Sequence, residues 1–582
     1  MRRTIKAAAV AATAALVAAG TVAAGTVAAG TIPAQARAGG GRFDQPQAGF
    51  APARTVLRTA TPRAAGLDPA PLEAAWRSVV GFEQPQAAGH PLFPGAVLTY
   101  GHQGKIVLQR ASGYSRLYAD GQGTLLPEAE RIRTTTDTIY DMASVSKLFT
   151  SIVVMQQVER GRIDLDAPVA TYVPEFAANG KAGITIRQLL THTSGFPAFL
   201  PFWRDQPDPA SRLQAALTAA LVNPPGSTYL YSDLNLITLG EVVHRVSGTP
   251  LDRLVTDGIT RPLGMVDTGY NPDPSLKARI AATEYQAEPA RGMVWGEVHD
   301  ENAWSFGGVA GHAGVFSTAA DMAVLAQTMI NGGAYGRHRI LRASSVEQMI
   351  TNENEAFPGD EHGLGFELNQ RWYMGGLSSL RTAGHTGYTG TSLVIDFSSR
   401  SFVILLSNRV HPSRSWGSVN PARVAAAQGL AEAMAVRPRS GRDAWFSGTA
   451  NARTATLTVP VTSRRASELR FDQFVDTEET DLLTLQISVD DGQTWQTLPY
   501  RLGDRQVTGG FSVAGLRRWQ RGVAALPAGS DLLRWTYTQD AALSGRGVYV
   551  DSIRLTDGRR TVVDVEHHPG MVTAEGWVRA RR

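Results

Sequence analysis

The stretch DMASVSK at residues 141–147 places a serine hydroxyl and a lysine amine three positions apart, directly before a run with helical spacing from Leu148 to Arg160. Positions i and i+3 of a helix share one face, so Ser144 and Lys147 are expected to lie side by side. A buried amine beside a hydroxyl can lose its proton, and it can then accept the serine proton as the oxygen attacks a carbonyl carbon. The stretch therefore predicts Ser144 as a nucleophile and Lys147 as its base.

Ser-x-x-Lys alone is a weak pattern, and a solvated lysine near a helix start is its ordinary explanation. In this chain, however, Ser144 is the only serine that stands three residues before a lysine. Two further segments follow in the chain, YLYSDLN at residues 229–235 and GHTGY at residues 384–388, the second leading into a strand-like run. The three segments together carry the functional prediction.

These three segments resemble the motifs of class C β-lactamases, D,D-peptidases and their esterase relatives. The resemblance continues through RGRIDLDAP at 160–168, LLTHTSG at 189–195 and GHAGVFST at 311–318. It implies an α/β fold of the β-lactamase/transpeptidase type over residues 63–436, in which an antiparallel sheet is combined with a helical subdomain. Strand-like segments at both ends of this region, with helical segments between them, agree with a sheet shared by its two ends.

Carried over by position, Tyr231 resembles the family's Tyr-x-Asn tyrosine, which shares the Ser144 proton with Lys147 and passes it to the leaving group. The third position of that motif is usually Asn, but here it is Asp233. A carboxylate there could hold Lys147 charged and oppose its use as a base. Two arrangements stay open: Lys147 is the base, or Tyr231 is the principal base with Lys147 as its electrostatic partner.

The last motif usually reads Lys-Thr-Gly, and here a histidine, which ordinarily titrates near pH ~6.5, replaces the cation. In the family this segment lies on a strand edge, and the N–H of the residue after the glycine joins that of Ser144 as the oxyanion hole. The resemblance thus implies three catalytic residues, Ser144, Lys147 and Tyr231. It also implies a substrate-binding set of Asp233, His385, Thr386, Gly387 and Tyr388.

Other candidate chemistry is less well supported. His192 and His312 lie in segments that the family uses to shape the core and the cleft floor, so we expect structural roles for both. No Gly-x-Ser-x-Gly occurs, which argues against an α/β-hydrolase elbow. No spacing of His and carboxylate residues suggests zinc. No cofactor and no metal are predicted.

The N-terminus has the layout of a signal peptide: Arg2, Arg3 and Lys6 precede a long Ala/Val run that ends in small residues near Ala38. We expect residues 1–38 to be this signal, residues 39–62 to be a flexible leader, and the mature protein to be secreted from a bacterium without stable membrane insertion. The chain has no cysteine, and its formal net charge of +4 includes the basic signal. A nearly neutral mature protein gives no general electrostatic reason to expect nucleic-acid binding.

Beyond residue 436 the pattern changes to short alternating segments separated by Gly and Asp turns. We expect a linker at 437–444 and an all-β, jelly-roll-like sandwich at 445–582. SVDDGQTW at 488–495 resembles an Asp-box hairpin, which is usually a structural turn. Exposed tryptophans such as Trp519 could bind glycan or cell-wall peptidoglycan, although a core or spacer role is favoured for this part.

The sequence therefore predicts a secreted serine hydrolase that forms an acyl-enzyme at Ser144 on small-molecule or peptide substrates. The candidate substrates are D-amino-acid peptides, esters and β-lactams, corresponding to a D,D-carboxypeptidase, an esterase or a β-lactamase. The alternative is a cell-wall or glycan-binding adhesion protein that uses the hydrolase fold only to capture a ligand.

Overall fold

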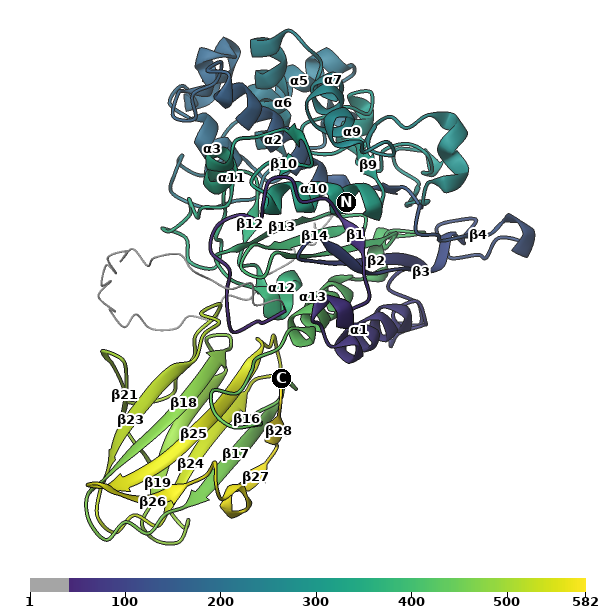
Figure 1. The fold of residues 1–582 in the computed structure, drawn as a ribbon. Helices are drawn as coiled ribbons and strands as arrows, with labels where there is room; N and C mark the ends of the chain where they lie inside the picture. Colours follow the sequence, from purple (N-terminus) through teal and green to yellow (C-terminus); the bar gives the residue numbers. More distant parts are fainter. Residues whose placement is uncertain (1–40) are drawn as a thin grey trace, which may run out of the picture. The chain divides into compact units, whose positions relative to one another are not determined.

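The computed structural model describes residues 41–582, so the predicted signal peptide and the first two residues of the predicted leader lie outside the described residues. Among the described residues, no helix combines the length and apolar character needed to cross a lipid bilayer. The first part of the described chain is built on one large sheet, and the second part is all β (Figure 1).

The large sheet has the strand order β1-β3-β2-β15-β14-β13-β12. Its pairings are antiparallel, except that β1 joins β3 in parallel. Early and late strands meet where β2 pairs with β15, so the two ends of this part share one sheet as predicted. The strands are β1 (Arg58–Thr59), β2 (Gly95–His102), β3 (Lys105–Arg116), β12 (Glu367–Leu368), β13 (Thr382–Thr386), β14 (Ser392–Asp396) and β15 (Ser401–Ser407).

Helices cover both faces of this sheet (Figure 1). Helix α10 packs on β2, β14 and β15 from the side that holds the helical subdomain, whereas α1 and α13 pack on each other and on the opposite face. The predicted α/β architecture with an antiparallel sheet and a helical subdomain is confirmed. The main helices are α1 (Pro69–Gly81), α2 (Ser146–Glu159), α3 (Ile186–Leu190), α5 (Pro209–Leu217), α6 (Asp233–Ser247), α7 (Leu251–Val255), α9 (Glu301–Ser305), α10 (Ala319–Ile330), α11 (Ala343–Met349), α12 (Arg371–Met374) and α13 (Asn420–Ala433).

Helix α2 is the central helix of the subdomain, and its first twelve residues are all buried. A helix buried on every side must lie inside other elements, and the polar residues of α2 are therefore buried together with its apolar ones. It packs against α6, which begins at Asp233. This packing brings the second motif of the sequence next to the first and removes Lys147 from solvent.

The leader differs from its prediction. Phe43 is only 1% exposed and packs in the core on the α1 and α13 side of the sheet. Its N–H donates to the carbonyl oxygen of Ala435 at 2.8 Å, and further along the leader β1 joins the sheet edge. A segment rich in Gly, Ala and Pro has no periodicity, but one aromatic side chain and a few non-local backbone hydrogen bonds are enough to fix it.

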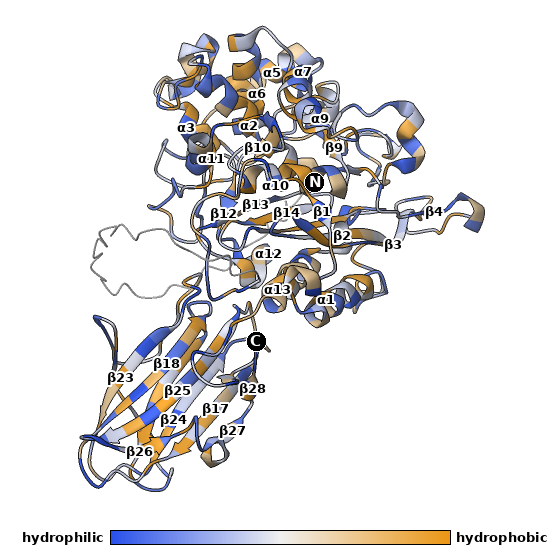
Figure 2. Ribbon diagram, in the orientation of Figure 1, coloured by the Kyte–Doolittle hydropathy of each residue, from blue (hydrophilic) through white to orange (hydrophobic). Residues whose placement is uncertain are grey.

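The C-terminal part consists of two packed antiparallel sheets with one core between them. Buried and more exposed residues alternate along strands such as β17 and β24, and Figure 2 shows hydrophobic and hydrophilic residues mixed along the strands of this part. The predicted β-rich architecture is confirmed. Its strands of three or more residues are β16 (Ala444–Phe446), β17 (Arg453–Pro460), β18 (Ser467–Asp476), β19 (Leu482–Ser488), β21 (Tyr500–Leu502), β22 (Arg505–Val507), β23 (Gln520–Leu526), β24 (Leu532–Gln539), β25 (Gly547–Asp557), β26 (Arg560–Asp564), β27 (Thr573–Glu575) and β28 (Val578–Ala580).

Two sequence features of this part have structural explanations. In the Asp-box-like segment, the N–H of Gly492 donates to Ser488 Oγ at 2.9 Å and the N–H of Thr494 donates to Asp490 Oδ1 at 2.8 Å, so the segment is a self-braced turn. Trp519 was expected to be exposed, but it is half-buried, and its Nε1–H donates to the carbonyl oxygen of Arg437 at 3.0 Å. Its ring packs against the rings of Phe474 and Tyr549.

A buried ion pair connects the two parts. Arg517, in the loop before β23, donates to Asp396 Oδ2 at the end of β14 at 2.6 Å, and both side chains are almost completely buried. The same guanidinium donates to the carbonyl oxygen of Leu377. The large sheet and both sheets of the C-terminal part belong to one compact unit.

Candidate active site

The turn that carries Ser144, the predicted nucleophile, is fixed by several hydrogen bonds and is called the nucleophile turn below. Ser144 lies in a short 3₁₀ turn, Ala143–Val145, that leads into α2, and Ala143 has a φ of +46°, a left-handed conformation that is uncommon for a residue with a side chain. The N–H of Ala143 donates to Asp141 Oδ1 at 2.8 Å, and the N–H of His299 donates to the other oxygen of that carboxylate at 2.6 Å. The Asp141 carboxylate therefore fixes the backbone just before Ser144.

Lys147 lies directly beneath Ser144, as the spacing predicts. Its side chain is only 1% exposed, and Nζ donates to Ser144 Oγ at 2.9 Å, to Asp233 Oδ1 at 2.7 Å and to the carbonyl oxygen of His312 at 3.2 Å. Burial acts to lower the pKa of Lys147, but the charges of Asp233 and Tyr231 outweigh it and raise the pKa above its ordinary value. All three ammonium protons have acceptors, so the resting group is a cation.

Tyr231 lies against this ammonium group, with Lys147 Nζ 4.9 Å from the centre of its ring. Burial raises the pKa of Tyr231 to about 12, Lys147 lowers it, and Asp233 adds to the increase. The three acceptors around Lys147 Nζ suit the electrostatic role that the second predicted arrangement gives to Lys147. Asp233 contacts Lys147, as expected for a carboxylate at this position, and it also lines the smaller of the cavities at Ser144.

His192 supports the tyrosine motif from behind. Its ring lies 4.6 Å from the ring of Tyr231, and its Nδ1 accepts from the N–H of Ser232 at 3.1 Å and from Asn235 Nδ2 at 3.0 Å. Burial lowers its pKa well below the ordinary value, so the ring stays neutral. The contacts are those of a positioning side chain, in agreement with the structural role expected for it.

The third motif lies at the end of β13. His385 is 1% exposed, its Nδ1 lies 2.8 Å from the carbonyl oxygen of Thr386, and its Nε2 has no hydrogen-bond partner among the described residues. Burial, followed by the charge of Lys147, lowers the pKa of His385 to about 3. The expectation of a group titrating near pH ~6.5 is therefore wrong: this histidine is neutral, with Nδ1 protonated and Nε2 as a free acceptor.

Gly387 is required by close packing. A Cβ atom at this position would lie 2.1 Å from Thr391 Oγ1 and 2.5 Å from the carbonyl oxygen of Met142. Two threonines tie the same turn to the nucleophile turn: Thr389 Oγ1 donates to the carbonyl oxygen of Asp141 at 2.7 Å, and Thr391 Oγ1 donates to that of Met142 at 3.1 Å. The N–H groups of Ser144 and of the residue after Gly387 are thereby held in neighbouring turns.

Two adjoining cavities open onto Ser144. The larger, about 620 Å³, is lined by Ser144, Tyr231 and the four predicted residues of the third motif. The smaller, about 300 Å³, shares Ser144, Tyr231 and Tyr388 with it and adds Asp233. Tyr388 is 49% exposed and forms part of the wall of both. Every predicted site residue except the buried Lys147 thus lines one of the two cavities.

The sequence reasoning missed several charged residues in these walls. Arg409 and Arg423 line the larger cavity, and Arg414 lines both. Arg414 is paired with Glu284 and Glu301, which hold its charge in place. These residues come from segments far from the three motifs in sequence and have no fixed spacing to them. No local pattern could have identified them.

His312 has a second neighbour in addition to Lys147. Its Nε2 lies 2.9 Å from Asp300 Oδ1, and ligand-type atoms of Asp233, Asp300 and His312 all lie within 4.8 Å of one another. This spacing could suit a metal ion, but the Lys147 ammonium already neutralises Asp233. A second group with such spacing, formed by Glu478, Asp481 and Asp540, lies in the β-rich part.

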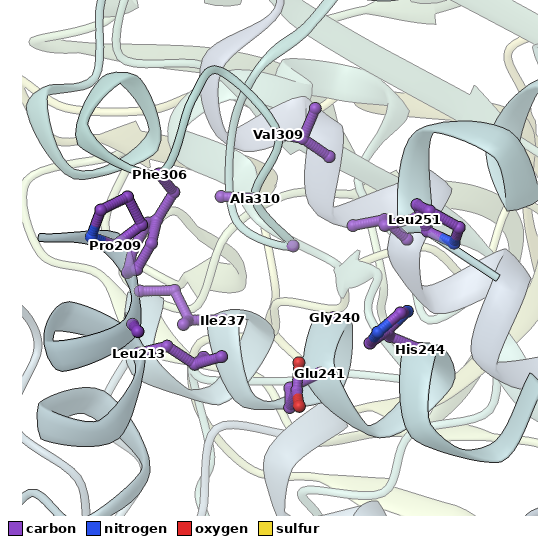
Figure 3. Close-up of a pocket in the computed structure, with 13 residues that line it drawn as sticks. Pro209, Leu213, Ile237, Gly240, Glu241, His244, Leu251, Phe306, Val309 and Ala310 are labelled. Atoms are coloured by element: carbon purple, nitrogen blue, oxygen red, sulfur yellow. The ribbon is translucent and has the colours of Figure 1, made fainter. Parts of the chain in front are cut away.

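A separate cavity of about 380 Å³ lies on the outer side of α6 (Figure 3). Its lining is mostly apolar, with Leu213, Ile237 and Phe306 pointing into it, and Glu241 and His244 are its charged or titratable side chains. None of the predicted site residues lines it. The predicted nucleophile, Ser144, lines the other two cavities and not this one.

Comparison with known proteins gives consistent results. The model of the Beta-lactamase family matches residues 83–428. A putative D-alanyl-D-alanine carboxypeptidase of Salmonella schwarzengrund (strain CVM19633) is 36% identical over 404 residues, which cover 64% of this chain and 90% of that protein. A protein of the same description from Salmonella typhi has the same identity and coverage.

Solved structures with a similar fold include a novel penicillin-binding protein homolog from Caulobacter crescentus, with 21% identity, a TM-score of 0.48, and coverage of 62% of this chain and 98% of that chain. A family VIII carboxylesterase has 22% identity, a TM-score of 0.47, and the same coverage of the two chains.

Proposed function

The chain belongs to the Beta-lactamase family of serine hydrolases, and from this we propose that it is an exported peptidase that removes a C-terminal D-amino acid from peptides. The observation that carries this choice is Arg409. It lines the larger cavity together with Ser144, and it has no carboxylate partner among the described residues. An unpaired guanidinium near the nucleophile is suited to hold the terminal carboxylate of a peptide.

The 36% identity to putative D-alanyl-D-alanine carboxypeptidases, over nine-tenths of their length, supports the same choice. An ester lacks the terminal carboxylate that Arg409 would bind, so esterase activity is the second candidate. β-Lactams carry both a reactive amide and a carboxylate, and they are the natural inhibitors or substrates to test.

In the proposed reaction, Ser144 Oγ attacks the peptide carbonyl carbon, and the N–H groups of Ser144 and Tyr388 stabilise the negative oxygen. The C–N bond then breaks, and the serine proton passes through Tyr231 to the leaving amine. A water molecule attacks the resulting ester, Tyr231 takes its proton while giving its own proton to Ser144 Oγ, and the Ser144 Oγ–carbonyl bond breaks to release the acid and restore the serine hydroxyl. Lys147 stabilises the negative charge that develops on the Tyr231 oxygen during each proton transfer.

We also propose that the protein acts outside the cell, on the basis of the signal-like residues 1–38. The β-rich part is proposed as a spacer, with glycan or peptidoglycan binding as its alternative. Co-sedimentation of the full-length Ser144→Ala protein with purified peptidoglycan tests the alternative, and a protein that stays in the supernatant counts against it.

The deciding experiment is the intact mass of the mature protein after brief exposure to a penicillin and, separately, to a fluorophosphonate, with Ser144→Ala alongside. We expect a Ser144-dependent mass gain with the penicillin. We also expect release of D-alanine from an acetylated Lys-D-Ala-D-Ala peptide. A protein that reacts with neither reagent and releases no D-alanine is the adhesion alternative, not an enzyme. Labelling by the fluorophosphonate alone, with ester turnover, selects an esterase.

A further inference from the structure

Arg423 is the buried cation of the larger cavity. It lies in the first turn of α13 and is 7% exposed, although it lines the cavity that contains Ser144. Its Nη2 donates to the carbonyl oxygen of Gly387 at 2.7 Å and to that of Thr391 at 2.9 Å, and its Nη1 donates to Asn420 Oδ1 at 2.9 Å. No carboxylate among the described residues forms an ion pair with it.

The Gly387 carbonyl belongs to the same peptide unit as the N–H of Tyr388. A peptide unit is planar and nearly always trans, so its C=O and N–H point in opposite directions. A donor that fixes the carbonyl oxygen of Gly387 therefore also fixes the direction in which the Tyr388 N–H points. Arg423 holds the carbonyl from the α13 side, and the N–H belongs to a residue that lines both cavities at Ser144.

Arg423 also closes the turn that carries this peptide unit. The N–H of Gly387 donates to the carbonyl oxygen of Thr391 at 2.8 Å, and the N–H of Gly390 donates back to the carbonyl oxygen of Gly387 at 3.0 Å. The two carbonyl oxygens that accept these bonds are the two that Arg423 contacts. Although burial, and then Arg409, lower the pKa of Arg423 to about 10, the guanidinium remains charged at neutral pH. Hydrogen bonds from charged donors are stronger than neutral ones.

We propose that Arg423 is a positioning residue for the oxyanion hole: its bonds to the carbonyl oxygens of Gly387 and Thr391 orient and polarise the peptide unit whose N–H, on Tyr388, stabilises the negative oxygen of the transition state. The inference rests on the proposed function of Ser144. If Arg423 has this role, it assists acylation by every substrate, whether or not the substrate has a terminal carboxylate.

The competing role for Arg423 is recognition of a substrate carboxylate. A neutral ester distinguishes the two roles. Hydrolysis of p-nitrophenyl acetate needs an oxyanion hole, but the ester has no carboxylate to be recognised. The positioning role predicts that Arg423→Met slows acylation by p-nitrophenyl acetate about 10- to 100-fold. This decrease is smaller than the ~10²- to 10³-fold decrease in turnover caused by removing an oxyanion-hole donor, because the variant displaces the Tyr388 N–H but does not remove it. It also predicts that KM for the ester changes less than about twofold.

Arg339→Met is the matched control. Arg339 also donates from one nitrogen to two backbone carbonyl oxygens, those of Gly332 and Leu341, and it lines neither cavity at Ser144. The Arg339→Met variant should be acylated by p-nitrophenyl acetate at the same rate as the wild type. Arg423→Lys, which keeps a charge but can rarely span both carbonyls, should give an intermediate rate.

The comparison uses the full-length protein, with acylation followed by the p-nitrophenol burst and by D-alanine release from the acetylated tripeptide. An equal loss of acylation rate on both substrates supports positioning. A loss confined to the tripeptide, or no loss on either substrate, overturns it.

A crystal structure of Arg423→Met separates this inference from the proposed function. If the wild-type protein turns over neither substrate, the proposed function fails, but the orientation of the Gly387–Tyr388 peptide can still be read. A peptide unit that rotates in the variant supports the positioning role, and one that keeps its orientation overturns it.

Discussion

The pairing of Lys147 with Asp233 can be tested by Asp233→Asn, which removes one negative charge and keeps the shape of the side chain. In the structure this carboxylate accepts from Lys147 Nζ at 2.7 Å, raises the pKa of Lys147 and adds to the rise in the pKa of Tyr231. Without the Asp233 carboxylate, less negative charge opposes the effect of burial on Lys147, so the pKa of Lys147 should fall. The pKa of Tyr231 should also fall, because Asp233 contributes to its increase. The proton acceptor would then be available at a lower pH.

The size of the effect follows from the geometry. Two unit charges about 4 Å apart attract by about 4 kcal/mol at an effective dielectric constant of about 20. Since one pKa unit corresponds to about 1.4 kcal/mol, that would be about 3 units. Asp233 is partly exposed, so solvent screening reduces the expected shift to about 1–2 units.

The assay is the pH dependence of kcat/KM for p-nitrophenyl acetate between pH 5 and pH 10.5, in wild type and Asp233→Asn. Because both candidate acceptors titrate above this range in the wild type, the displacement is read between the sloping parts of the two profiles. The limb that rises with pH should move about 1–2 units toward acid in the variant. Asp321→Asn is a suitable control, because this buried carboxylate accepts from Thr268 and from the N–H of Asp267, away from Lys147. A rising limb that stays within about 0.3 unit of the wild type would refute the argument that Asp233 holds the amine charged.

Stability gives a second readout with a defined sign. The pKa of Lys147 is higher in the folded protein than in the unfolded chain, so its contribution to folding is complete below the unfolded pKa of ~10.4 and is lost as pH rises through the folded pKa. Asp233→Asn should therefore lower Tm most at neutral pH, because it leaves a buried ammonium without its counter-ion. The difference from wild type should narrow above about pH 10.4; a constant difference would contradict the assignment.

Three further predictions concern other contacts. Gly387→Ala should slow acylation at least about 100-fold and lower Tm, because its Cβ would meet the carbonyl oxygen of Met142 and displace the turn; a rate near wild type would show that the turn can move freely. Arg409→Ala should raise KM more for the acetylated Lys-D-Ala-D-Ala peptide than for its C-terminal amide, and an equal effect on both would remove the carboxylate assignment. Phe43→Ala should lower the free energy of unfolding by about 3–5 kcal/mol in urea titrations, with no loss expected if the leader were flexible.

The sequence was sufficient for the three motifs because each is a short run whose chemistry depends on adjacent positions. Ser144 and Lys147 are one helical turn apart, so their contact is local. The sequence also indicated that Asp233 could affect the charge of Lys147, because this position carries a carboxylate where the family usually has an amide. It could not decide the charge state of Lys147, which depends on burial by α6 and on the carbonyl oxygen of His312, more than 160 positions away.

The neutral state of His385 and the contacts of Arg423 were inaccessible for the same reason. A histidine has an ordinary pKa until its surroundings are known, and here the surroundings are formed by segments distant in the chain. Arg423 lies in a helix after the last motif, where an arginine is usually a solvated side chain. Phe43 was missed because composition describes a segment as a whole, whereas a single aromatic residue can anchor it.

The hydrogen bond from Phe43 to Ala435 has a practical consequence for engineering. It brings the two limits of the hydrolase part to adjacent positions, with Arg42 also bridged to Ala435. A few glycine residues could span such a gap, which is the condition for circular permutation, and new termini could be opened in the exposed segment 204–209.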